Sequence, residues 1–132
     1  MKKKKSVSDK YLLKLLREAS LIKHGHRCFI CGNMNIKELD IHHIIKRKHK
    51  ILRYDWRNTV PVCRFGCHSK IDSIMGIRLL EELRPLDMIH LREYENMTFK
   101  DYCRNYEITE NEFLSMMKNQ LKSIIQNYDD FI

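Results

Sequence analysis

The stretch LDIHHIIKRKHK, residues 39–50, places two adjacent histidines, His42 and His43, in a short apolar run and follows them with a block of cations. Residues 39–45 are rich in apolar and β-branched side chains, which favours a strand. The cations that follow, up to residue 57, indicate a basic loop. Because successive side chains of a strand point to opposite faces, the two histidines taken alone could simply be one packed ring and one exposed ring.

Two cysteine pairs lie on either side of this stretch. Cys28 and Cys31 form a C-x2-C pair, and Cys63 and Cys67 form a C-x3-C pair. Both spacings are typical of zinc knuckles, and four thiolates complete a tetrahedral site. The odd cysteine count and the absence of any sign of an oxidising compartment argue against a disulfide framework. We therefore expect a structural zinc ion that replaces missing core, and we interpret Cys103 as a core thiol.

Helical periodicity appears before and after the cysteine-rich region. Apolar residues recur at helical spacing over residues 12–22, where Ser8 is suited to cap the helix. A second helix is predicted from Cys67 to about Leu83. It should end there because the residue before the following proline disfavours helical geometry. Two further helices are predicted near the C-terminus, one beginning at Thr98 and one at the capping box of residues 109–112.

Composition limits the chain to one ordinary domain of 132 residues. Residues 1–80 hold 19 Lys and Arg against 6 Asp and Glu, whereas residues 81–132 hold 6 against 11. The first part is therefore expected to face a polyanion, although charge runs are also common on solvated faces. No apolar run reaches the roughly 20 residues needed to cross a bilayer. We expect a cytoplasmic protein with no membrane partner.

The order of these motifs resembles that of the HNH endonuclease family. The segments that carry the resemblance are LIKHGHRCFICG, LDIHHII, WRNTVPVC and GCHSKID. The resemblance implies an α+β fold with a small ββα-metal (His-Me finger) core, a four-cysteine zinc site and flanking N-terminal and C-terminal helices. It divides the chain into a basic arm and helix (1–24), a nuclease core (25–84) and a helical extension (85–132). The second knuckle departs from the family pattern, because three residues separate its cysteines.

The resemblance also implies roles for individual residues. His43 would be the general base that activates water, and His42 and His68 would bind a catalytic divalent ion, Mg²⁺ or another. Asn58 would hold the base and its loop in place or contribute to the metal site. His68 could instead bind zinc if a cysteine of the second knuckle is displaced, and Asn58 alone could be a turn residue.

A metal-dependent DNA endonuclease, of phage or mobile-element type, is the function that follows. The alternative is a zinc-stabilised DNA-binding module that does not cut. The cations expected to contact phosphates, with Arg57 and Arg64 nearest the scissile group, are Lys46, Arg47, Lys48, Lys50, Arg53, Arg57 and Arg64. Their alternative role is solubility of the loop. For the acidic C-terminal helices, packing or homodimer formation is favoured over a DNA-reading helix-turn-helix.

Overall fold

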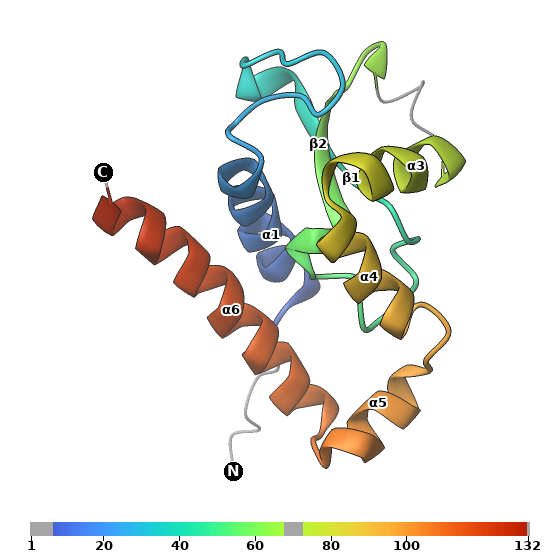
Figure 1. Ribbon diagram of the computed structural model, residues 1–132. Helices are drawn as coiled ribbons and strands as arrows, with labels where there is room; N and C mark the ends of the chain where they lie inside the picture. The colour runs from blue at the N-terminus through green and yellow to red at the C-terminus, as the bar shows by residue number, and fades with distance from the viewer. Residues whose placement is uncertain (1–6, 68–72, 132) are drawn as a thin grey trace.

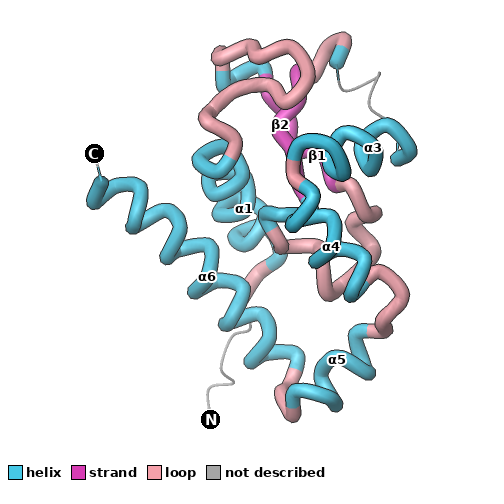
Figure 2. The backbone as a smooth tube through the Cα atoms, viewed as in Figure 1, coloured by secondary structure: helices cyan, strands magenta, loops and turns pink. Residues whose placement is uncertain are grey.

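A two-stranded antiparallel ribbon lies at the centre of the fold. The computed structural model describes residues 7–67 and 73–131, and its strands are β1 (Leu39–His43) and β2 (Thr59–Cys63). Leu39 pairs with Cys63 at one end of the ribbon and His43 pairs with Thr59 at the other. Helices and long loops surround the strands (Figure 2). The small α+β architecture is as predicted.

Helices make up most of the remaining described structure (Figure 1). Two short 3₁₀ turns each lead directly into a strand. In chain order the helical elements are α1 (Asp9–Lys23), η1 (Ile36–Glu38), η2 (Trp56–Asn58), α3 (Ser73–Leu83), α4 (Pro85–Tyr94), α5 (Phe99–Tyr106) and α6 (Glu110–Phe131).

Helix α1 forms where the apolar periodicity predicts it and is tied to the start of β1. The Ser8 side chain accepts a hydrogen bond from the Tyr11 backbone N–H, which confirms the predicted cap. Farther along the helix, the Arg17 guanidinium donates to the carbonyl oxygens of Leu39 (2.7 Å) and Ile36 (2.8 Å). One cation therefore fixes both the strand and the 3₁₀ turn before it on the N-terminal helix.

Two groups of buried side chains hold the molecule together. The ribbon cluster collects apolar residues of both strands, the loop between them and α4, including Leu39, Leu52, Val60, Val62 and Leu91. The α1–α6 cluster packs Leu12, Leu16, Phe113 and Leu121 against Tyr54. Phe99 and Tyr102 of α5 touch both clusters, so the C-terminal helices join the two halves of the core.

Helix α3 ends at Leu83, as predicted from the proline that follows. The same proline starts a further helix, α4, which the sequence reading did not anticipate. Pro85 occupies the first turn of α4, where its missing N–H has no helical partner to lose. The first part of the helix predicted to begin at Cys67 falls on residues 68–72, which lie outside the described structure.

The last two helices begin at the predicted caps. The Thr98 side chain accepts from the Asp101 N–H at the start of α5. At the start of α6, the backbone N–H groups of Thr109 and Glu112 each bond the other residue's side chain at 3.1 Å, which is a complete capping box. Helix α6 runs alongside α1 (Figure 1) and buries its apolar stripe there, so the packing role predicted for this helix is confirmed.

Within residues 7–67 and 73–131, no helix combines the length and the apolar character needed to cross a membrane.

Candidate metal and catalytic site

Four cysteine sulfurs meet at the end of the ribbon where Leu39 pairs with Cys63. The Sγ atoms of Cys28, Cys31, Cys63 and Cys67 all lie within 4.8 Å of one another. A tetrahedral zinc site with Zn–S bonds of roughly 2.3 Å separates its sulfurs by about 3.8 Å. None of the four is in a disulfide. The predicted metal-binding cluster is therefore present, with its sulfurs close enough to share one ion.

The first knuckle is shaped by its own backbone. The N–H groups of Ile30 and Cys31 point at the Cys28 sulfur, at 3.4 and 3.5 Å. The N–H of Phe29 also donates to the Pro61 carbonyl at 2.8 Å, which docks the knuckle on the outer edge of β2. Burial raises the pKa of Cys28, but hydrogen bonds from backbone N–H groups and from the Cys31 thiol together outweigh burial and lower the pKa to about 6, which favours the thiolate that a metal needs.

The second knuckle accommodates its additional residue without losing a ligand. Gly66 adopts a φ of +93°, a left-handed conformation that residues with a Cβ rarely take, and Phe65 turns outward with 84% of its surface exposed. Cys67 then returns to the other three sulfurs. Burial and the neighbouring thiols raise its pKa to about 12, because clustered thiolates repel unless a cation neutralises them.

His43 lies at the opposite end of the ribbon from the cysteines. Its Nε2 donates to the carbonyl oxygen of Arg53 at 2.8 Å, since a carbonyl can only accept. The lone pair is then left on Nδ1. Burial, with the nearby charges of Arg47 and Arg53, lowers the pKa of His43 to about 4. The ring is therefore neutral near pH 7 and held in one orientation, as a general base requires.

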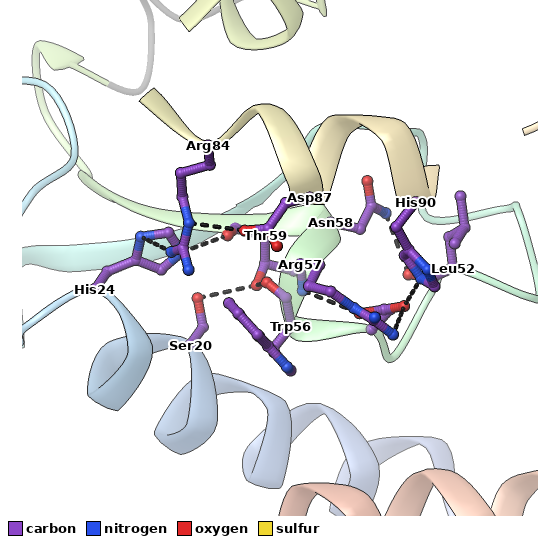
Figure 3. Close-up of polar contacts among 11 residues, drawn as sticks. Ser20, His24, Leu52, Trp56, Arg57, Asn58, Thr59, Arg84, Asp87 and His90 are labelled. Atoms are coloured by element: carbon purple, nitrogen blue, oxygen red, sulfur yellow. Dashed lines mark hydrogen bonds and ion pairs between the residues drawn. The ribbon is translucent and has the colours of Figure 1, made fainter. Parts of the chain in front are cut away.

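Asn58 closes the long loop that connects the strands. Its side chain is fully buried and makes three hydrogen bonds across the loop. Its Oδ1 accepts from the Ile45 N–H at 2.7 Å, and its Nδ2 donates to the carbonyls of Ile45 (3.0 Å) and Leu52 (3.1 Å). The Leu52 bond is drawn in Figure 3. Because Arg53 follows Leu52, Asn58 also positions the carbonyl that orients His43.

Of the two histidines predicted to bind a catalytic ion, the structure describes only His42. His42 is partly buried and pairs with Val60 across the ribbon, so its side chain leaves the strand on the face opposite to that of His43. His68 lies outside the described residues. The predicted pairing of these two histidines around one metal ion therefore stays a prediction.

The predicted DNA-binding cations fall into two groups. Lys46, Arg47, Lys48 and Lys50 are exposed on the loop that follows β1. Lys50 also lies 4.0 Å from Glu110. The other three are in closer ion pairs: Arg53 with Asp9 (2.8 Å), Arg57 with Asp55 (2.9 Å) and Arg64 with Asp40 (3.1 Å). Arg64 also follows Cys63, at the far end of the ribbon from His43, and the structure does not bring the two together.

Polar contacts that the sequence reading did not anticipate tie α4 to the strand connection (Figure 3). Asp55 accepts from His90 Nε2 at 2.6 Å, from the Arg57 side chain at 2.9 Å and from the Arg57 N–H at 3.0 Å. Burial would raise the pKa of Asp55, but the His90 and Arg57 hydrogen bonds lower it below its usual value. Only the proline and acid at the start of α4, Pro85 and Asp87, signal this helix in the sequence.

A second unanticipated contact joins the end of α1 to β2 and α4. His24 Nε2 donates to the Thr59 carbonyl at 2.9 Å, and Arg84 Nη1 lies 3.0 Å from His24 Nδ1. Arg84 is in turn paired with Asp87 at 2.7 Å. These residues converge beside Thr59, the cross-strand partner of His43 (Figure 3). The end of the ribbon that carries His43 is therefore fixed from both sides.

Comparison with known proteins agrees with the motif order. Residues 28–73 match the family model of the HNH endonucleases, and this segment holds both knuckle pairs, both strands, His42, His43 and Asn58. The resemblance is confirmed over this part of the chain. No curated protein and no solved structure matches the chain.

Proposed function

We propose that this HNH-type segment makes the protein a metal-dependent endonuclease that hydrolyses DNA phosphodiester bonds. The observation that carries the proposal is the state of His43, a neutral imidazole locked by the Arg53 carbonyl at the end of the ribbon. With Nε2 bonded to the carbonyl, the lone pair on Nδ1 is left to accept the proton of a water molecule, which is the task of a general base.

In this mechanism His43 takes the proton of the attacking water at Nδ1. The resulting imidazolium shares its Nε2 proton with the Arg53 carbonyl, whose position depends on the bonds that Asn58 makes. His42, with His68, would hold a divalent ion such as Mg²⁺, which supplies charge stabilisation at the scissile phosphate. The exposed cations of the loop after β1 would hold the phosphates of the strand.

The four-cysteine cluster has a structural role in this proposal, with zinc as its ion. An all-thiolate set of four ligands is typical of closed structural zinc sites, which leave no position open for water or substrate. The cluster also lies at the opposite end of the ribbon from His43. The ion would stabilise the ribbon and its two knuckles while hydrolysis takes place at the other end.

Plasmid cleavage by the wild type and His43→Ala tests the function. Supercoiled plasmid is incubated with zinc-loaded protein, with Mg²⁺ or Mn²⁺ added or omitted. We expect the wild type to nick or linearise the plasmid only with added metal, and His43→Ala to lose at least about 100-fold in rate, as expected for loss of a general base. His26→Asn is the matched control, because His26 has a φ of +56° that asparagine tolerates.

Two results would contradict the proposal. His43→Ala cutting at the wild-type rate would remove the assigned base. A wild type that shifts DNA in a gel but never cuts it, whatever metal is added, would favour the DNA-binding module instead.

A further inference from the structure

A cavity of about 390 Å³ opens beside the loop that holds His43. Its size falls in the range of small-molecule sites, roughly 300–1,000 Å³. The start of α1, the loop between the strands, α5 and the start of α6 all contribute to its wall. Most of its lining is charged or aromatic: Asp9, Arg47, Lys48, Lys50, Arg53, Tyr54, Phe99, Glu110 and Phe113.

The charges of the cavity favour an anion. Four cations face two carboxylates in its wall. The charge of Asp9 is already neutralised, because the Arg53 guanidinium donates a hydrogen bond to each of its carboxylate oxygens at 2.8 Å. Arg47 and Lys48 are exposed, and neither side chain has a hydrogen-bond or ion-pair partner among the described residues. Two cations therefore remain free to bind phosphate.

The remaining wall is apolar and partly aromatic, and is formed by Val7, Tyr54, Phe99, Phe113 and Leu114. Phe99 is partly buried and is held edge-on by Phe113, with ring centroids 5.0 Å apart. The Lys50 ammonium lies 5.6 Å from the Phe99 centroid. Lys50 is also paired with Glu110 at 4.0 Å, so the cations left for a phosphate beside this ring are Arg47 and Lys48. Cations beside a partly exposed aromatic ring suit a single-stranded nucleic acid, because the ring can stack on a base while the cations neutralise the backbone.

One residue connects the cavity to His43. The Arg53 carbonyl accepts from the His43 ring, while the Arg53 side chain lines the cavity and donates to the Arg47 carbonyl at 3.0 Å. The cavity and the proposed base are therefore separated by a single residue of one loop. A strand whose phosphate reaches His43 has its adjoining nucleotide within reach of the cavity.

We propose that this cavity binds one unstacked nucleotide of the DNA strand, next to the phosphodiester that is cut. Its phosphate lies on Arg47 and Lys48 and its base lies against Phe99. The proposal rests on the proposed nuclease function. It gives the helical extension, through α5 and α6, a direct role in holding substrate, and it makes single-stranded or locally opened DNA the preferred substrate.

Fluorescence of 2-aminopurine tests the proposal without requiring cleavage. A short single-stranded oligonucleotide with one central 2-aminopurine is titrated with zinc-loaded protein in the His43→Ala background. Stacking on Phe99 should quench the fluorophore, and Phe99→Leu, which keeps an apolar side chain but removes the ring face, should abolish the quenching. Affinity should also fall at least about fivefold, the lower end for losing one base stack.

Lys48→Ala and Lys46→Ala form a matched pair, because both lysines are exposed on the same loop and only Lys48 lines the cavity. Lys48→Ala should weaken binding several-fold more than Lys46→Ala. Equal losses in the pair, or wild-type quenching by a Phe99→Leu protein with an unchanged melting temperature, would overturn the proposal. Failure of the wild type to cut plasmid would instead count against the nuclease function. The fluorescence and affinity measurements could still be interpreted, because they do not require cleavage.

Discussion

Asn58 shows how one side chain can replace a stretch of regular structure. The ribbon ends at the His43–Thr59 pair, and the following loop has no strand partner to satisfy its backbone. A carboxamide offers an acceptor and two donors at once, and Asn58 uses all of them on Ile45 and Leu52. A carboxylate would lose both donors, and an alkyl side chain would leave buried backbone groups unpaired. The order of the loop therefore depends on an amide at this position.

His24 is the residue whose protonation state the fold constrains through two partners. Its Nε2 donates to the Thr59 carbonyl, and the Arg84 guanidinium, which can only donate, lies across the ring with Nη1 3.0 Å from Nδ1 and 3.2 Å from Nε2. Burial and the Arg84 charge lower the pKa of His24 to about 4 from an ordinary value of 6.5. Between these values the unfolded chain binds a proton that the folded protein does not. The contribution of neutral His24 to the free energy of unfolding is therefore complete above about pH 6.5 and is lost as the pH falls toward 4.

A His24→Gln variant should lose this part of the pH dependence, because glutamine offers a donor and an acceptor but does not titrate. We expect the free energy of unfolding to fall by about 2 kcal/mol more in the wild type than in the variant between neutral pH and about pH 4.5. Urea unfolding at both pH values measures the difference. Comparing the two proteins cancels the contributions of the cysteines and His43, so parallel pH profiles would contradict the assignment.

At the scale of elements, α4 is fastened to η2 by a buried carboxylate. Asp55 precedes η2 and caps it by accepting a hydrogen bond from the Arg57 N–H. Its carboxylate also accepts a hydrogen bond from His90 of α4. Only 10% of its side chain is exposed, so water screens these contacts poorly. These contacts of Asp55 with Arg57 and His90, the Asp55 clamp, lie next to Asn58, the last residue of η2. Helix α4, which lies outside the matched segment 28–73, therefore supports the loop that orients His43.

Asp55→Ala should destabilise the protein by about 3 kcal/mol, because it leaves Arg57 and His90 facing a buried site without their acceptor. Asp101→Ala is the matched control. Asp101 pairs with Arg104 at 46% and 71% side-chain exposure, and its loss should cost less than about 1 kcal/mol. Thermal or urea unfolding of both variants measures the contrast, and equal losses would show that the Asp55 clamp contributes no more than a surface pair.

Local signals predicted the elements that begin with their own caps. Ser8, Thr98 and the Thr109–Glu112 box each sit within one turn of the helix they start, so the sequence contains the whole interaction. The cysteine spacing likewise predicted the metal cluster. The Asp55–His90 and His24–Thr59 contacts join residues 35 positions apart, and no local pattern encodes them. The pairing of Arg53 with Asp9, 44 positions away, was hidden for the same reason.

At the scale of the whole molecule, the two core clusters depend on the metal to different degrees. The ribbon cluster includes the buried cysteines Cys28, Cys63 and Cys67, so its packing is continuous with the knuckles. The α1–α6 cluster contains no cysteine, and all its buried members except Tyr54 come from α1 and α6, whose N-termini are capped. Phe99 and Tyr102 are the main apolar link between them.

Removal of the metal should therefore unfold the molecule in part. We expect one zinc ion per chain by atomic absorption, and loss of it to a chelator or through Cys31→Ser should expose the amides of β1 and β2 to hydrogen exchange. The amides of α1 and α6 should keep part of their protection, since their cluster has its own buried contacts. Cys103→Ser is the control, because Cys103 lies outside the cluster and should leave zinc content unchanged. Uniform loss of protection over the whole chain would show instead that the ribbon and the helix pair fold as a single cooperative unit, and that the short link through Phe99 and Tyr102 is strong enough to couple them.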